Sequence, residues 1–223
     1  MMKTAKAVYE SVEKSILDMF KAADIYALHL LSKFRNSPPP TNDTIESIVN
    51  GSSSLLRLTG ALYTKAERQL LEKDGHLRSI GQQILVASYT AVELYLINKF
   101  QEFYRNTLAG VPDAFVEASI EQLSFRSLKD ISKLYFNFYN IHLPSFDIKF
   151  HTVEESNFRP NTAWQALQLL STARNEIVHR GESVATGSTC WWILGIRLSL
   201  HAIMSSCLTL ILIILFTEKR CRV

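Results

Sequence analysis

The first 35 residues of the chain place apolar side chains at steps of three or four, and this spacing constrains the fold more than any other feature. Such steps put side chains on one face of an α-helix, so the pattern predicts one long helix over residues 4–35. Prolines at 38–40 cannot continue it and begin a linker. The residues that set the pattern are Val8, Val12, Ile16, Met19, Ala23, Tyr26, Leu30 and Phe34.

Similar patterns recur along the rest of the chain, and turn residues separate them. With 8 Gly and 6 Pro among 223 residues, the chain is too poor in turn residues for a many-stranded sandwich, and its 47% hydrophobic content is too high for disorder. We therefore expect an all-α protein, with a loop over 141–160. The further predicted helices are 43–49, 55–73, 77–105, 114–123, 126–140, 162–180 and 190–217.

The breaks between these patterns predict the organisation of the chain. A long helical segment comes first, then a linker rich in proline and serine, then a helical domain that includes the apolar C-terminal helix, and finally a basic tail. The predicted segments are 1–36, 37–54, 55–217 and 218–223.

Charge and cysteine content narrow the functional classes only a little. A net charge of +3 neither indicates nor excludes a nucleic-acid binder. The three cysteines, Cys190, Cys207 and Cys221, are widely spaced without a CxxC pair, so they predict neither a zinc site nor a disulfide framework. The N-terminus carries Glu10 and Glu13 and lacks the apolar core of a secretory signal, so we expect a cytoplasmic protein.

An apolar run of 19 residues, 198–216, reaches the length of a membrane span. If it did span, the cations of the tail at 218–223 would keep that tail in the cytoplasm and put the domain outside. A helical bundle with a motif helix at 162–180 also needs a closing helix, and a central or dimer-buried helix is apolar almost all round. We therefore expect the last helix of a dimerising bundle, with the membrane span as the alternative.

An arginine lies where the predicted helix 162–180 is most apolar. At about 100° per residue, Leu167, Leu170 and Ile177 all fall within about 60° of Arg174. A guanidinium there must be paired, or must face an interface or a cleft. Asn175 and His179 follow on one flank as an i, i+4 pair that can touch.

A carboxylate is similarly misplaced on the predicted helix 77–105. Glu93 falls among apolar neighbours such as Tyr89 and Ile97, so it needs a cationic partner, and Arg174 is the candidate. One interpretation is a buried ion pair that fixes the register of two helices, with His179 as a helix C-terminal histidine favoured by the helix dipole. The other interpretation is a functional site.

The sequence RNEIVHRG at 174–181 resembles the R-x4–6-H motif of the HEPN superfamily (higher eukaryotes and prokaryotes nucleotide-binding domains). Four residues separate Arg174 from His179, and Asn175 supplies the polar residue that follows the arginine. The earlier helix ILVASYTAVELYLINKF resembles the HEPN helix that carries an acidic residue, here Glu93. The resemblance covers residues 55–216. It implies a HEPN-like antiparallel helical bundle, to which the long N-terminal helix is an extra element.

The resemblance implies a metal-independent endoribonuclease that cleaves RNA to 2′,3′-cyclic phosphate and 5′-OH ends. His179 would act as general base or acid, since imidazole titrates near neutral pH. Arg174 would hold the phosphate, and Glu93 would orient Arg174. Asn175 would orient His179 or donate to the phosphate, and Arg180 would add an RNA backbone contact or remain a solvated cation.

The resemblance also implies a homodimer whose two motifs form one cleft, acting on RNA as a toxin or a phage-defence effector with a cognate antitoxin as a further partner. The alternative is a non-catalytic HEPN-like module for dimerisation or binding. We expect no cofactor and no metal, because the remaining histidines lack metal-ligand spacing. They are His29, His76, His142, His151 and His201.

Overall fold

The computed structural model describes residues 4–50, 64–145 and 163–180. Helices make up most of these ranges and no strand occurs within them, which confirms the all-α prediction for this part of the chain. The described helices are α1 (Ala5–Phe34), α2 (Asn42–Asn50), α4 (Lys65–Lys73), α5 (Gly75–Thr107), α6 (Asp113–Glu121), α7 (Leu128–Tyr139), a short 3-10 turn (Leu143–Ser145) and α8 (Ala163–Arg180).

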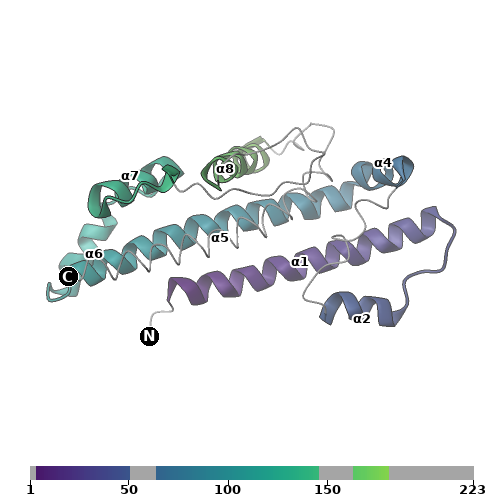
Figure 1. The fold of residues 1–223 in the computed structure, drawn as a ribbon, viewed down its shortest axis with the longest axis horizontal. Helices are drawn as coiled ribbons and strands as arrows, with labels where there is room; N and C mark the ends of the chain where they lie inside the picture. Colours follow the sequence, from purple (N-terminus) through teal and green to yellow (C-terminus); the bar gives the residue numbers. More distant parts are fainter. Residues whose placement is uncertain (1–3, 51–63, 146–162, 181–223) are drawn as a thin grey trace.

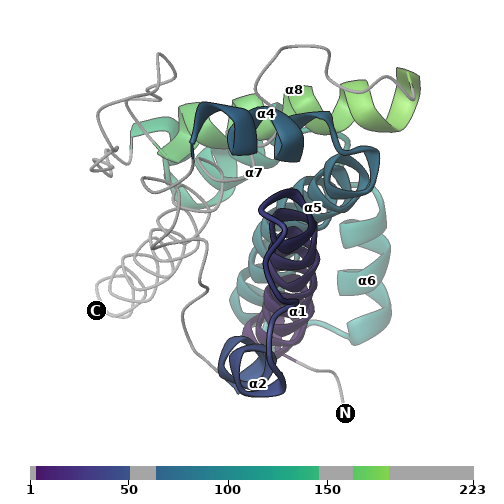
Figure 2. The same ribbon diagram turned by 90° about the vertical axis from the view of Figure 1, so that its right-hand side faces the viewer.

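Helix α5 is the centre of the arrangement. Helix α1 lies along one side of it, while α7 and α8 lie on the other side (Figure 1). The view along α5 shows the same order, with α8 running across the top (Figure 2). Side chains from all four helices meet in one core, so α5 is covered on two sides.

The predicted long first helix is confirmed, and its ends have local causes. At the start, the Thr4 hydroxyl accepts the backbone N–H of Ala7 at 3.3 Å and so caps α1. At the other end, Asn36 adopts a left-handed backbone with φ 52°, and the proline run begins two residues later. The predicted helix over 43–49 appears as α2.

The predicted break at Asp74 is confirmed as well. The Asp74 carboxylate accepts the backbone N–H of Leu77 at 2.8 Å, which caps α5. Its second oxygen accepts the Tyr26 hydroxyl of α1 at 3.3 Å. One side chain therefore begins α5 and also ties that end of α5 to α1.

Helices α1 and α5 run antiparallel and share a core. The backbone N–H of Ala5 donates to the Glu102 carboxylate at 2.5 Å near one end of the pair, and the rings of Tyr9 and Tyr95 meet edge to face at 5.4 Å. Ile16 and Phe20 of α1 belong to the same buried cluster as residues of α5 and α8. The boundary predicted at residue 36 thus separates two segments that pack around one core.

An aromatic cluster fixes α7 against α5. Phe100 is completely buried, and its ring meets those of Tyr135 and Tyr139 edge to face at 5.5 and 5.4 Å. The buried Tyr135 hydroxyl donates to the backbone oxygen of Leu96 at 2.8 Å. Because that hydrogen bond has one geometry, it sets the position of α7 along α5.

Helix α8 crosses α5 steeply instead of lying alongside it, as both ribbon views show (Figures 1 and 2). Leu167, Leu170 and Ala173 are buried at the crossing, and the buried Leu143 of the 3-10 turn packs in the same cluster. Antiparallel packing thus joins α1 to α5, whereas α8 crosses α5, so the described residues do not confirm the expected HEPN-like antiparallel bundle. A crossing helix covers α5 over a short length, and it brings one face of α8 against one stretch of α5.

Helix α5 is long and apolar enough to cross a membrane by length and composition alone, and half of its most apolar window is buried inside the fold. The core helix of a soluble protein meets the same criterion. The predicted helix 190–217, its apolar run 198–216 and the basic tail lie outside the described residues, as does most of the predicted loop 141–160.

A charged contact joins the end of α1 to the start of α4. Glu67 is 4% exposed, and its carboxylate accepts the Nε–H of Arg35 at 2.5 Å and the backbone N–H of Thr64 at 2.7 Å. Thr64 in turn accepts the backbone N–H of Glu67, completing a capping box. The hydrogen bond from Arg35, followed by that from the Thr64 backbone, lowers the pKa of Glu67 to about 2.

We expect Glu67→Gln to lower the free energy of unfolding by roughly 1–3 kcal/mol at neutral pH, because charge-assisted hydrogen bonds are lost. The pKa of Glu67 is lower in the folded chain than the ordinary glutamate value of 4.5. The contribution of the ionised carboxylate to the free energy of unfolding is therefore complete above about pH 4.5 and is lost as the pH falls towards about 2. Urea unfolding at several pH values should show wild type and variant converging across that window.

Glu10→Gln is the matched control, because Glu10 pairs with Lys6 at 3.6 Å on the exposed surface of α1. Such a pair contributes at most about 1 kcal/mol. The difference in free energy of unfolding between wild type and Glu67→Gln should shrink across the acid range. A constant difference would contradict the assignment of the stabilisation to the ionised carboxylate.

Candidate functional site

The predicted motif lies on the half of α8 that follows its crossing with α5. Leu170 and Ala173 are buried there, and Arg174 is partly buried beside them. Arg174 therefore adjoins the buried stripe of α8 but is itself only partly buried. Val178, one turn further on, is 49% exposed, so the packed face of α8 ends close to Arg174.

One nitrogen of the Arg174 guanidinium makes a hydrogen bond, and another makes none. Its Nη1–H donates to the Asn175 side-chain oxygen at 2.9 Å. Its Nε is buried and makes no hydrogen bond. A buried donor without an acceptor costs about 1–3 kcal/mol, so the fold holds Arg174 in a position that is not optimal for its own stability.

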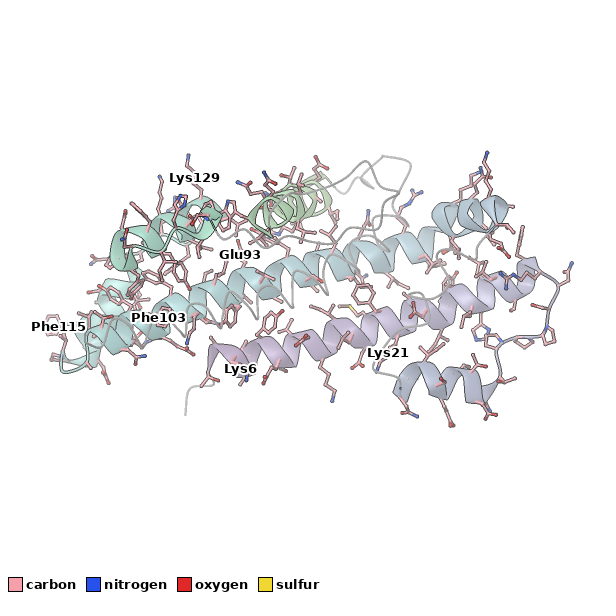
Figure 3. The ribbon with its side chains drawn as sticks, viewed as in Figure 1. Lys6, Lys21, Glu93, Phe103, Phe115 and Lys129 are labelled. Atoms are coloured by element: carbon pink, nitrogen blue, oxygen red, sulfur yellow. The ribbon has the colours of Figure 1, made fainter. Side chains whose placement is uncertain are left out.

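Glu93 lies on α5 near the part covered by α7 and α8 (Figure 3). It is partly buried, and its carboxylate accepts the Tyr89 hydroxyl, one turn earlier on the same helix, at 3.0 Å. Although both residues are described, no ion pair joins Glu93 to Arg174. The expected direct ion pair is therefore wrong, because each side chain forms a hydrogen bond within its own helix instead.

Tyr89 is where α5 and α8 meet at this site. It is 3% exposed, and burial is the main reason that its pKa is raised to about 12. The nearby Ser171 side chain and the charge of Arg174 lower that pKa, whereas the charge of Glu93 and the hydrogen bond to it raise the pKa. The phenol is therefore protonated at neutral pH.

Sequence reasoning missed Tyr89 and Ser171 as members of the site. Tyr89 stands four residues before Glu93, and Ser171 stands three residues before Arg174. These are the spacings at which helical side chains are neighbours. A search for polar groups one turn away from each misplaced charge would have found both residues.

Asn175 and His179 are exposed, on a different side of α8 from its buried stripe. In a helix, His179 lies about 140° around and about 7.5 Å along the axis from Arg174. No hydrogen bond joins Asn175 to His179, although both are described, and the Asn175 oxygen accepts from Arg174 instead. Arg180 is the last residue of α8, and its side chain lies outside the described part.

Within the described ranges, no group of three or more His, Cys, Asp or Glu side chains is placed to hold a metal ion. His29, His76 and His142 belong to those ranges, whereas His151 and His201 lie outside them.

The site thus offers a guanidinium that can bind an anion through more than one N–H, and an exposed imidazole that can exchange a proton. Comparisons with protein-family models, with curated protein sequences and with solved structures give no match to this chain.

We expect Arg174→Met to leave the free energy of unfolding unchanged or to raise it by up to about 1 kcal/mol. Methionine fills a similar volume and removes the unsatisfied buried Nε–H. Urea unfolding at neutral pH measures the change. A loss of more than about 2 kcal/mol would show instead that Arg174 is a structural residue whose removal leaves a partner charge uncompensated.

Proposed function

We propose that the protein is a metal-independent endoribonuclease of the HEPN type, which cleaves RNA to 2′,3′-cyclic phosphate and 5′-OH ends. The observation that carries the proposal is the Arg174 guanidinium, which is held by Asn175 and keeps a buried Nε–H without an acceptor. Position 174 is also the arginine of the R-x4-H sequence. A phosphate oxygen is the acceptor that such a guanidinium suits best.

In the proposed reaction, Arg174 binds the scissile phosphate and stabilises the negative charge that develops on its oxygens. An imidazole of His179 takes the proton of the ribose 2′-OH, whose oxygen attacks the neighbouring phosphorus and displaces the 5′ oxygen. The leaving 5′ oxygen receives a proton from solvent and becomes the 5′-OH end. Asn175 acts in this scheme by holding Arg174.

The placement of the two motif residues supports a composite site. Because His179 points about 140° away from Arg174 around α8, one helix cannot easily direct both side chains at the same phosphate. A second copy related by a twofold axis would set His179 of the partner subunit beside Arg174. We therefore propose a homodimer, acting in the cytoplasm as a toxin or a defence effector that a cognate antitoxin restrains.

The second candidate is a non-catalytic HEPN-like module for dimerisation or binding. Two hydrogen bonds favour it, because Tyr89 with Glu93 and Arg174 with Asn175 each form a pair within one helix. Polar pairs of this kind also serve a purely structural role. The two candidates differ in one outcome, which is whether the protein cleaves RNA.

We expect the purified protein to cleave RNA in the presence of EDTA, and His179→Ala to reduce the single-turnover rate by at least about a hundredfold, which is a typical contribution of general acid–base catalysis. Gel mapping of the product ends should show 2′,3′-cyclic phosphates. His142→Ala is the matched control, since His142 is exposed and lies outside α8. Cleavage that survived in His179→Ala would overturn the catalytic assignment, and no cleavage by wild type would favour the binding module.

We expect a mixture of Arg174→Ala and His179→Ala proteins to regain part of the cleavage activity that each variant lacks alone. In a mixed dimer, one of the two composite sites would hold an intact arginine and an intact histidine. The measurement is RNA cleavage after the two variants are mixed and allowed to exchange subunits. A mixture that forms mixed dimers and stays inactive would show that each protomer must supply both residues.

A further inference from the structure

We propose that the solvent face of α7 is a binding surface for single-stranded RNA. On this face Lys129 and Lys133 contact phosphates of the strand, and the ring of Phe136 stacks on a base. We call these three residues the α7 surface. Its contribution to cleavage rests on the proposed function, whereas its binding of RNA does not and can be measured without cleavage.

The three side chains of the α7 surface share one side of the helix. Steps of four and three residues put Lys133 about 40° and Phe136 about 20° from Lys129 around the helix axis. Both lysines are exposed, and Lys129 points away from α5 (Figure 3). The buried residues of α7 lie on its other side and are Leu128, Ile131 and Tyr135. The α7 surface is therefore open to solvent and extends about 10 Å along the helix.

The two lysines of the α7 surface lack a compensating charge. Among the described residues neither lysine takes part in an ion pair. Asp130 is the one acid of α7, and its carboxylate accepts the hydroxyl of Ser127 at 2.9 Å. Like charges four residues apart destabilise a helix, and a cation in the first turn opposes the helix dipole. The lysines thus do not stabilise α7, and their placement suits an anion from outside the chain.

The aromatic member of the α7 surface can receive a base. Phe136 is 51% exposed, although its neighbour Tyr135 is fully buried. The ring of Phe136 meets that of His142 edge to face at 6.1 Å, and such a contact covers at most one face of the Phe136 ring. An aromatic face stacks on any base, because every base has a π face. Bases of a duplex are already stacked on each other, so an exposed ring favours single-stranded RNA.

The α7 surface lies next to the motif helix. Helices α7 and α8 cover the same side of α5 (Figures 1 and 2), and the 3-10 turn Leu143–Ser145 contacts both of them. Uncompensated cations on a surface attract a polyanion and raise its local concentration. A strand bound along α7 would therefore be held close to Arg174 on α8.

The first experiment measures the affinity of the full chain for a fluorescent single-stranded RNA, with His179→Ala present in every protein so that the RNA stays intact. We expect Lys129→Gln with Lys133→Gln to weaken binding about tenfold at low salt and to reduce the slope of log K against log salt by about 1.4, since each phosphate contact on a single strand contributes about 0.7. The matched control is Lys65→Gln with Lys73→Gln, which removes the same charge from exposed positions of α4, at the other end of α5 (Figure 1).

The second experiment removes the stacking ring. We expect Phe136→Ala to weaken binding of single-stranded RNA by about five- to a hundredfold, which is the range for losing one base–aromatic stack, and to leave the salt slope unchanged. Its affinity for duplex RNA should change less than about twofold. Phe115→Ala is the matched control, because Phe115 is 69% exposed and lies on α6. All variants should keep the urea midpoint of their parent, because the replaced side chains are exposed.

The outcomes separate the α7 surface from the proposed function. Unchanged RNA affinity in the lysine variant or in Phe136→Ala, or an equal loss in the control variants, would overturn the α7 surface and leave the ribonuclease proposal standing. An equal loss of duplex binding in Phe136→Ala would overturn the choice of single-stranded RNA. Binding of phosphatidylserine vesicles without binding of RNA would overturn the α7 surface as an RNA site.

Cleavage kinetics give the converse test in the protein with an intact His179. If that protein cleaves RNA, the lysine variant should raise KM and leave kcat within about twofold, because phosphate contacts outside the reacting group bind substrate and transition state equally. RNA binding that depends on α7 in a protein that never cleaves RNA would overturn the ribonuclease proposal and support the α7 surface.

Discussion

The burial of α5 on two sides is the constraint on which the rest of the structure depends. Helix α1 covers one side in an antiparallel pair, and α7 and α8 cover the other side, so a single core holds all four helices. Phe100 on α5 is completely buried, and rings of α7 surround it. A helix packed in this way cannot shift along its axis without opening the core on both sides, because protein interiors are close-packed.

The candidate site takes its geometry from this rigid central helix. Tyr89 and Glu93 lie on the stretch of α5 that α8 crosses, and their hydrogen bond gives the site one fixed oxygen. Arg174 approaches from the crossing helix, and its exposed flank carries Asn175 and His179. The steep crossing explains why only a short part of α8 is packed, so that a partly buried arginine and an exposed histidine occur within five residues of one another.

Much of the helical structure could be predicted because its causes are local. The limits of α1 follow from Thr4 and the proline run, and the start of α5 follows from the Asp74 cap. The core face of α1 was predicted less well: Val8 and Val12 are only partly buried, whereas Tyr9 is 4% exposed. A wide apolar stripe does not fix which side of α1 faces the core. The position of α5 decides that.

The sequence by itself determined that helices form, where most of them begin and end, and that Arg174 and Glu93 are charged groups on apolar faces. These properties depend on residues within one turn of each other, and they persist whatever the helix packs against. Only the tertiary structure decided the partners of those charges. Glu93 accepts from Tyr89 and Arg174 donates to Asn175, because the choice between a partner on the same helix and one across the interface depends on how α8 crosses α5.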